Sequence, residues 1–429
     1  MVCSCLQASA QTNLDSLWNI WSDQTKADSS RLQAINRFLQ AGYLYSQPDS
    51  AFYFAQLQYD FAEKSGQKVH MADALTAQGV SFALKSNYPK ALEYFRKSLV
   101  VKEEIQNMSG IAGANNNMGS IYFSQGDLPR ALDHFQKGLK IFQKIGEKRK
   151  SLAPLMNISS IYHNQQNLTK ALENYELCLL IYEEADDKKG IADCLHRIGS
   201  IHDESGDQLT GLEYYQRSVK IATEIGDQFQ LAANYGSIGN TYSDQGDFPT
   251  AMDFHLKALK IHEETGFKTG SAGSLIAIGL LHHEQGEYQK SIDECSKALS
   301  FVLEVGEIST QKKACRCLYE AYKSTGNGTK ALEYHEQVLA LDDSLNAEET
   351  AKKLQLMEFQ KQVLADSLAN AEEARLVEEA HQEEVRQKNR TRNIFGGVGF
   401  FALLLAGGFY WRWRYVQKSK AVLQVEKDR

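Results

Sequence analysis

Residues 111–150 read IAGANNNMGSIYFSQGDLPRALDHFQKGLKIFQKIGEKRK, and their pattern recurs along the chain. From residue 71 to residue 350, a unit with the length of this stretch is written seven times without insertion or deletion. A column of mostly glycine sets the register: Gly79, Gly119, Ser159, Gly199, Gly239, Gly279 and Tyr319. Self-similarity at a fixed period of about 40 residues is typical of a solenoid, in which each repeat packs only on its neighbours.

Each unit predicts two helices. Residues 111–122 carry apolar side chains at helical spacing, and residues 131–145 do so again. Between them, Gly126 supplies the positive φ of a turn and Asp127 caps the second helix. One such hairpin cannot bury both of its apolar faces, so the units must stack.

The small and aromatic columns of the hairpin carry a resemblance to a known family. Gly119 and Ala131, with Tyr122 and Phe135 beside them, have the spacing of the tetratricopeptide repeat (TPR), which the chain resembles over about two thirds of its length. The unit is longer than the 34-residue form, and the proline that usually ends the second helix is absent. It is similar to the long repeats of spindle-orientation adaptors and bacterial sensor proteins. The resemblance implies an all-α fold, a right-handed superhelical solenoid.

The residues before the repeats predict two further parts. Residues 1–10 resemble the end of a secretory signal peptide, because Ala8-Ser9-Ala10 fits a small-x-small cleavage site. This remnant favours export, and a disordered cytosolic N-terminus is the alternative. Residues 11–70 are expected to form an N-terminal helix and a degenerate capping repeat, since Ala51 and Gly66 align with equivalent residues of the repeats.

Residues 351–393 contain no proline or glycine and are rich in Glu, Lys, Gln, Ala and Leu, which predicts a helical stalk. Five of these residues fit a heptad seam: Leu354, Met357, Leu364, Leu368 and Ala371. Lys361 interrupts the seam, so a short coiled coil and a single solvated helix are both open. A coiled coil would make the chain a homodimer through the stalk and the following helix.

Residues 394–411 form an uncharged run that is long enough to nearly span the hydrocarbon core as a transmembrane helix. Tyr410, Trp411 and Trp413 form an aromatic belt at its end. Residues 412–429 predict a polar helical linker. Together with the signal remnant, the flanking basic residues favour a single-pass protein of the bacterial inner membrane, with periplasmic repeats and a cytoplasmic C-terminus.

This order of parts resembles the input half of Bacteroidetes-type sensors, in which the linker leads to a class III nucleotide cyclase, a histidine kinase or a DNA-binding domain. The ending Glu426-Lys427-Asp428-Arg429 resembles the linker of TPR-linked adenylate and guanylate cyclases. Residues 1–429 contain no motif of those output domains. We therefore expect no catalytic residue, cofactor or metal site within them.

Composition and cysteine positions bound the remaining chemistry. A net charge of −7 gives no basic excess for nucleic acid. Cys178 and Cys295 fall in core columns and are predicted to be small buried hydrophobes. A Cys178–Cys194 or Cys295–Cys315 bond is the alternative in an oxidising compartment. Cys315 and Cys317 are too close in sequence for a zinc pair.

The first helices of TPR hairpins line the concave face of the solenoid, and this resemblance gives the candidate peptide-binding groove. Its residues are Asn116, Ser120, His163, Asn164, Asp193, His196, Asp203, Glu204, Asn240, Asp244, His283 and Glu284. They are polar, with an acidic centre, which favours a basic or amide-rich extended peptide. The Lys and Arg with which TPRs clamp the carboxylate of chaperones are absent, so chaperone binding is not expected. The alternative is that these residues are only solvated.

Two functions of different classes follow. The chain is a membrane-anchored receptor or scaffold that binds a protein or peptide, or it is the regulatory half of a cyclase or histidine kinase whose catalytic domain lies beyond residue 429. A structural assembly factor is a third interpretation.

Overall fold

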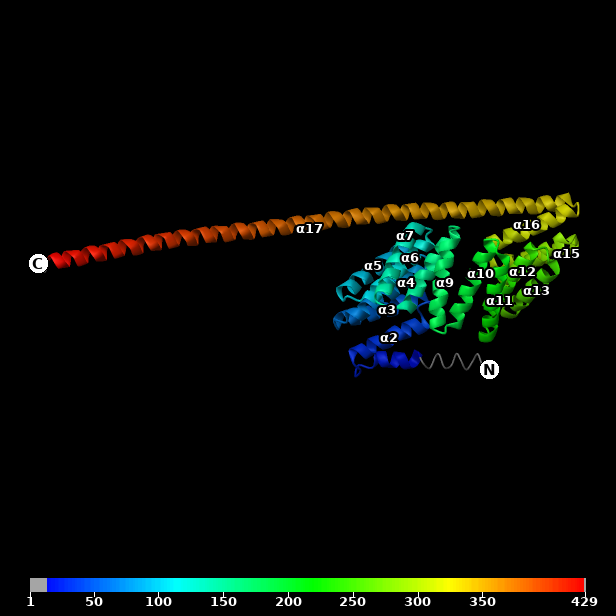
Figure 1. Ribbon diagram of the computed structural model, residues 1–429, viewed down its shortest axis with the longest axis horizontal. Helices are drawn as coiled ribbons and strands as arrows, with labels where there is room; N and C mark the ends of the chain where they lie inside the picture. The colour runs from blue at the N-terminus through cyan, green and yellow to red at the C-terminus, as the bar shows by residue number, and fades with distance from the viewer. Residues whose placement is uncertain (1–13, 428–429) are drawn as a thin grey trace. The chain divides into compact units, whose positions relative to one another are not determined.

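The computed structural model describes residues 14–427 of the chain. The predicted signal remnant, residues 1–10, lies outside this range. Within the range, only the backbone is described for residues 395–398, for residues 421–427 and for many residues between 348 and 377. Every regular element within the described residues is an α-helix, which confirms the predicted all-α fold (Figure 1).

Residues 14–22 form a helix, and the helices after it form antiparallel pairs joined by short turns. The first helices of the pairs are α2 (Asp28–Gly42), α4 (Lys68–Leu84), α6 (Met108–Ser124), α8 (Lys148–Asn164), α10 (Lys188–Glu204), α12 (Gln228–Asp244), α14 (Lys268–Glu284) and α16 (Ile308–Ser324). The second helices are α3 (Pro48–Lys64), α5 (Tyr88–Glu104), α7 (Leu128–Lys144), α9 (Leu168–Glu184), α11 (Gln208–Ile225), α13 (Phe248–Thr265), α15 (Tyr288–Val305) and α17 (Gly328–Lys427).

The period of the sequence holds in every pair. Both the first and the second helices begin one period apart along the whole series, including the α2–α3 pair that the sequence predicts as a degenerate cap. The helices α6 and α7 begin three residues earlier than the apolar pattern indicates. The reason is the capping turn. The side chains of Asn107 and Asp127 accept hydrogen bonds from the backbone N–H of Gly110 and Arg130, which starts each helix directly after its capping residue.

The turn between α6 and α7 shows how each first helix ends. The N–H of Asp127 donates to the carbonyl of Tyr122 at 2.9 Å, and the N–H of Gly126 donates to that of Phe123 at 2.9 Å. This pair of bonds is a Schellman motif, which needs a left-handed residue, and Gly126 has φ +79°. In the turns after α4, α5, α8 and α9 the left-handed residue is not glycine: it is Ser86, Gln106, Gln166 and Asp186, respectively.

The glycine column is where the two helices of a pair approach each other, as predicted. A Cβ on Gly119 would lie 2.7 Å from Cδ1 of Phe135, closer than side-chain atoms pack. Phe135 is fully buried, and so are the aromatic residues one and two repeats further on, Tyr175 and Tyr215. The small column therefore lets an aromatic side chain of the second helix fill the space between the helices.

At several junctions between successive helical pairs, a large side chain of one pair packs against a glycine of the next. Lys102 near the end of α5 lies against Gly110 of α6, where a Cβ would come within 3.0 Å of the Lys102 Cδ. One large residue of a second helix meets a glycine of the next first helix in the same way at two further junctions, Tyr182 with Gly190 and His262 with Gly270.

In several hairpins, an ion pair joins the start of the first helix to the end of the second. The ammonium of Lys148, at the start of α8, lies 2.8 Å from the carboxylate of Glu184, at the end of α9. The same two positions are paired in three other hairpins, as Lys68 with Glu104, Lys188 with Glu224 and Lys268 with Glu304. These pairs are exposed to solvent, so each contributes little to stability.

The structure corrects the predicted cysteine chemistry. Cys295 of α15 forms a disulfide with Cys317 of α16, rather than with Cys315 or as a free buried residue. Residues two apart on a helix point about 200° apart. Cys317 therefore faces α15, while the thiol of Cys315 points to Gln337 of α17 at 3.5 Å. The prediction for Cys178 is right, because it is buried and free, in one apolar cluster with Cys194.

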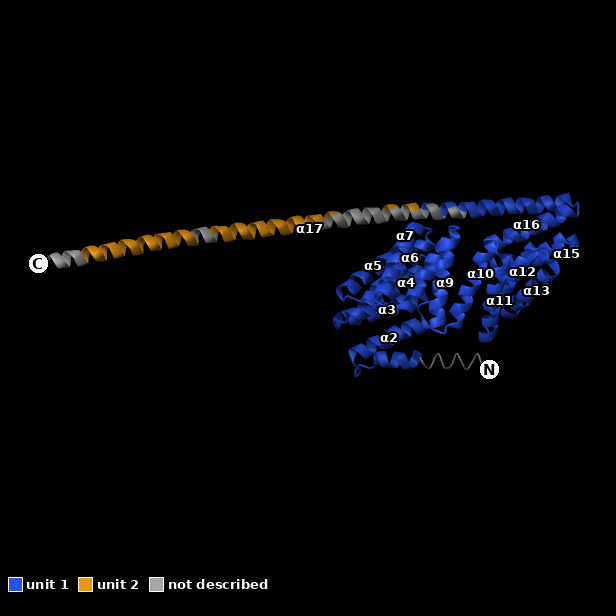
Figure 2. Ribbon diagram, viewed as in Figure 1, with its two compact units in different colours: residues 1–356 blue, residues 357–429 orange. Residues whose placement is uncertain are grey.

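The chain divides into two compact units, residues 1–356 and residues 357–429 (Figure 2). The first contains the stacked hairpins. The described part of the second consists of the continuation of α17, which holds the predicted stalk, apolar segment and linker as far as Lys427. Of the heptad residues, Leu354 and Met357 are exposed, whereas the side chains of Leu364, Leu368 and Ala371 lie outside the described residues.

One stretch of the second unit has the length and composition of a membrane span. This stretch, Glu378–Lys420, is the one candidate found among the described residues. Its apolar side chains are exposed, among them Phe400, Leu404 and Trp411.

Candidate functional site

The first helices lie on the inner side of the solenoid. The helices α10 and α12 touch directly, as do α12 and α14, whereas successive second helices make no comparable contact within the described residues. In a curved stack the elements that approach one another more closely lie on the concave side. The residues predicted to form the groove all belong to the first helices α6, α8, α10, α12 and α14.

Neighbouring repeats meet across the concave face through polar side chains. The Nε2 atom of His163 on α8 lies 3.0 Å from both carboxylate oxygens of Glu204 on α10. Ser200 also donates to Glu204, at 3.0 Å. Further along, Nε2 of His283 lies 2.9 Å from the hydroxyl of Ser324. Residues about one period apart are therefore direct neighbours on this face.

Three carboxylates, those of Asp203, Glu204 and Asp244, lie near one another at the centre of this face. The Oδ2 atom of Asp203 accepts a hydrogen bond from Thr241 at 3.1 Å, whereas its Oδ1 atom is buried without a partner. Burial raises the pKa of Asp203, and the charges of Asp244 and Glu204 raise it further, against the hydrogen bond from Thr241. Glu204 and Asp244 are exposed. We call Asp203, Glu204 and Asp244 the acidic strip.

Two other predicted groove residues are bound within the solenoid. Asp193 forms an ion pair with Arg197 on the same helix at 3.1 Å. His196 is held by a contact of 2.9 Å between its Nδ1 and Oδ1 of Asn234, and burial lowers its pKa. Both side chains support the packing of α10, so the acidic strip is narrower than the sequence implies.

The other predicted groove residues differ in how open they are. Asn164, Asn240 and Glu284 are exposed. Ser120 donates to the carbonyl of Asn116 at 3.1 Å, and the side-chain oxygen of Asn116 is buried without a partner. The side-chain oxygen of Asn116 is therefore not accessible from the groove in this structure.

The structure shows a second concave feature, which the sequence interpretation missed. A cavity of about 450 Å³ lies between α2, α4 and α6, lined among others by Asp73, Thr76 and Lys102. Lys102 belongs to a second helix, which is why a search confined to first helices omits it. A signal for it exists, because no equivalent residue is a lysine and most are apolar or aromatic: Ala62, Phe142, Tyr182, Ala222, His262, Val302 and Asp342.

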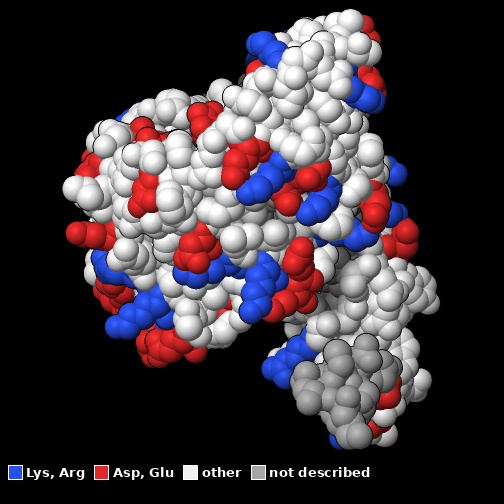
Figure 3. All heavy atoms as spheres, turned by 90° about the vertical axis from the view of Figure 1, so that its right-hand side faces the viewer, with Lys and Arg blue, Asp and Glu red and all other residues white. Residues whose placement is uncertain are grey.

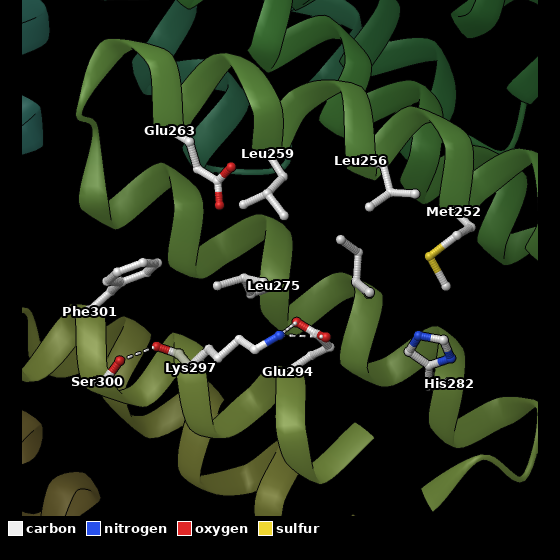
Figure 4. Close-up of a pocket in the computed structure, with 11 residues that line it drawn as sticks. Met252, Leu256, Leu259, Glu263, Leu275, His282, Glu294, Lys297, Ser300 and Phe301 are labelled. Carbon is white, nitrogen blue, oxygen red and sulfur yellow. Dashed lines mark hydrogen bonds and ion pairs between the residues drawn. The ribbon is translucent and has the colours of Figure 1, made fainter. Parts of the chain in front are cut away.

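A larger cavity, of about 660 Å³, opens between α13, α14 and α15. Figure 4 shows Met252, Leu256 and Leu259 of α13 along one side of it, with Phe301 of α15 and His282 of α14 at opposite ends of the other side. Its rim is closed in part by the ion pair of Lys297 with Glu294 at 3.0 Å. Two second helices and one first helix line this cavity, and most of its lining on α13 and α14 is apolar, so it differs from the polar concave face.

Charges elsewhere on the solenoid are mixed. Figure 3 shows acidic and basic side chains interspersed on the side that it presents, with neither sign gathered into a large patch. Many are already paired within one helix, as Lys137 with Asp133 at 2.7 Å.

The chain matches sequence profiles of a known repeat. Residues 112–145, 150–224 and 231–265 match families described as Tetratricopeptide repeat. The hairpins are tetratricopeptide repeats. No curated protein matches the TPR chain in sequence.

Solved structures share the fold of the TPR solenoid. The apo form of the quorum sensor NprR from B. thuringiensis is 15% identical, with a TM-score of 0.58 over 78% of this chain and 99% of that one. The apo form of RapI is 16% identical, with a TM-score of 0.54 over 64% and 99%. A STAND protein with a tetratricopeptide repeat sensor, from Pyrococcus horikoshii, is 13% identical, with a TM-score of 0.57 over 78% and 53%. At these identities the likeness shows the fold alone.

Proposed function

We propose that the TPR solenoid is a protein-interaction scaffold and the receptor part of a membrane-anchored signalling protein, and that its concave face binds a basic or amide-rich segment of peptide. The observation that carries this proposal is the acidic strip. It combines the exposed carboxylates of Glu204 and Asp244 with a buried oxygen of Asp203 that lacks a hydrogen-bond donor. An unpartnered buried acceptor is unfavourable until a donor reaches it.

Two solved structures of the same fold support a sensing role through their descriptions. NprR is described as a quorum sensor, and the repeats of the Pyrococcus protein as a sensor. Sensing by this chain remains our proposal, since the fold alone does not carry function.

Peptide binding is tested on the full chain in detergent with an array of short peptides, which vary in lysine, arginine, asparagine and glutamine content. We expect the variant Glu204→Gln with Asp244→Asn to weaken binding of the basic peptides about tenfold at low salt, because exposed charges attract over roughly 10 Å and are screened by salt. The matched control is Glu176→Gln with Glu213→Gln on the second helices α9 and α11. Equal binding by both variants would contradict the assignment of the strip.

Membrane anchoring is the second half of the proposal. The exposed apolar residues of Glu378–Lys420 need a lipid or protein partner. The disulfide of Cys295 with Cys317 favours an oxidising compartment for the repeats. We therefore propose that the TPR unit is periplasmic at a bacterial inner membrane, and that a change in packing of paired α17 helices carries the signal to a cytoplasmic output such as a nucleotide cyclase or histidine kinase.

Topology is tested with reporter fusions in a bacterial host. Alkaline phosphatase fused after Thr350 should be active, because the enzyme folds in the periplasm, and the same reporter fused after Arg429 should be silent. Green fluorescent protein at the two sites should give the opposite pattern. The reverse result would place the repeats in the cytoplasm, and activity at both sites would exclude a membrane span between them.

A further inference from the structure

The cavity between α2, α4 and α6 brings two opposite charges together on the concave face. It is lined by the carboxylate residue Asp73 of α4 and by Lys102, which reaches it from α5. Amides line it as well, from Asn36 of α2 and Asn117 of α6. Its volume of about 450 Å³ falls within the range of sites for small ligands.

Lys102 is held in a fixed position in this cavity. Its side chain is buried, with 6% of its surface exposed. Its ammonium donates to the hydroxyl of Thr76 at 2.9 Å, and that hydroxyl in turn donates to the carbonyl of Ala72 at 2.9 Å. Gly110 leaves room for the stem of the lysine. One of the three ammonium hydrogens is thus used, and two are available for a ligand.

Asp73 is the complementary group. It is half-buried. Within the described part of the chain, no residue donates a hydrogen bond to it and no cation lies within ion-pair distance. Burial raises the pKa of Asp73, while the positive charges of Lys102 and His70 oppose that rise. Burial lowers the pKa of Lys102, and Asp73 opposes it. The charges of Asp73 and Lys102 therefore attract each other across the cavity without forming a direct ion pair.

We propose that this cavity binds a zwitterion of the size of a free amino acid or a dipeptide. The ammonium of the ligand would donate to Asp73, and its carboxylate would accept from Lys102. An aliphatic side chain would contact the cavity's apolar residues, such as Leu39, Leu44 and Val80. Such a ligand supplies a partner to each charge at once, which a purely cationic or purely anionic ligand does not.

The chain itself gives a reason to connect Lys102 with binding. A buried ammonium with one hydrogen bond is unfavourable for folding, and four of the seven equivalent positions carry alanine, phenylalanine or valine. A methionine there would fill similar volume without the charge. This inference does not rest on the acidic strip, which lies on other helices, so either can fail alone.

Wild-type protein tests the proposal through changes in the ligand. Binding to the full chain in detergent is measured by calorimetry with each of the standard free amino acids, with leucine-containing dipeptides, and with leucinamide and N-acetylleucine. We expect leucine or another aliphatic amino acid, or its dipeptide, to bind. Leucinamide lacks the carboxylate and N-acetylleucine lacks the ammonium. Each should bind about 10- to 100-fold more weakly, the loss of one charge-assisted contact.

Variants then assign the charges. Lys102→Met should remove the preference for leucine over leucinamide, and Asp73→Asn should remove the preference for leucine over N-acetylleucine. Lys140→Met, on the exposed face of α7, should change neither. Circular dichroism checks that each variant keeps its helices.

Three results would overturn the proposal. The first is no binding of any amino acid or dipeptide up to about 10 mM, which corresponds to a binding free energy weaker than about −2.7 kcal/mol. The second is equal binding of leucine and its two blocked forms. The third is a preference that survives in a folded Lys102→Met with Asp73→Asn variant.

Discussion

The solenoid and the C-terminal part of α17 use the same residue types in opposite ways. In the solenoid, leucine fills the core, as Leu195 does with no exposed surface, and glycine serves turns and close contacts. In Glu378–Lys420, Leu404 is 57% exposed, and Gly407 and Gly408 lie inside a helix with no side chain near them. In the solenoid, the apolar side chains of the core are covered by residues of the same chain. The exposed apolar side chains of Glu378–Lys420 need a partner, which we propose is lipid.

The largest expected difference between the two regions concerns leucine. Leu195→Ala should lower the free energy of unfolding of the solenoid by about 2–5 kcal/mol, because it leaves a cavity in a packed core. Leu404→Ala should leave solenoid unfolding unchanged. Urea titrations followed by circular dichroism, on the full chain in detergent, measure both. A similar loss in the two variants would mean that Leu404 also packs against the solenoid.

A second effect is a pH dependence that belongs to the solenoid core. His255 stands in the aromatic column, is 3% exposed, and burial lowers its pKa to about 4. Its folded pKa lies below the unfolded value of about 6.5, so its contribution is present above pH 6.5 and is lost as pH falls toward 4. Between about pH 7 and pH 4.5 we expect a loss of roughly 2–3 kcal/mol.

The control for this pH dependence is His255→Phe, which restores the residue type of two other repeats. Between the same two pH values, the free energy of unfolding of the variant should fall by roughly 2–3 kcal/mol less than that of the wild type. Identical pH profiles of wild type and variant would show that His255 does not change its protonation on unfolding.

The smallest expected effect concerns the turns. Gln106 has φ +53° at the left-handed position where most turns have glycine. Gln106→Gly should stabilise the solenoid by about 1 kcal/mol, because glycine adopts this conformation without the steric cost. A rise in the thermal midpoint measures it, with Gln136→Gly on the exposed face of helix α7 as the control that should lower the midpoint. A fall in both would show that Gln106 contributes contacts worth more than its strain.

The sequence predicts the features that recur in every repeat better than the features that occur in only one. The glycine column and the burial of Phe135 follow from the period, because a constant unit can pack in only one way on its copies. The pairing of Cys295 does not follow, since Cys315 and Cys317 are both within reach in sequence and only the rotation of α16 decides between them. The pairing of Asp193 with Arg197 was within reach, because residues four apart on a helix share a face. The contact of His196 with Asn234 was not, because it joins two helices. Lys102 was within reach, since it alone puts a lysine in its column.

The matching of Lys102 with Gly110, and of Tyr182 with Gly190, limits how this protein can be lengthened or shortened. Any block one period long can be excised so that every later helix start returns to register. A block that runs from residue 108 to residue 147, however, would bring Lys102 against Lys150 instead of a glycine. The exchangeable module therefore has its edges within a hairpin, between the first and the second helix, so that both members of each matched contact stay in the same module. A duplication or deletion that respects the hairpin boundary alone would join two surfaces that were never shaped for each other.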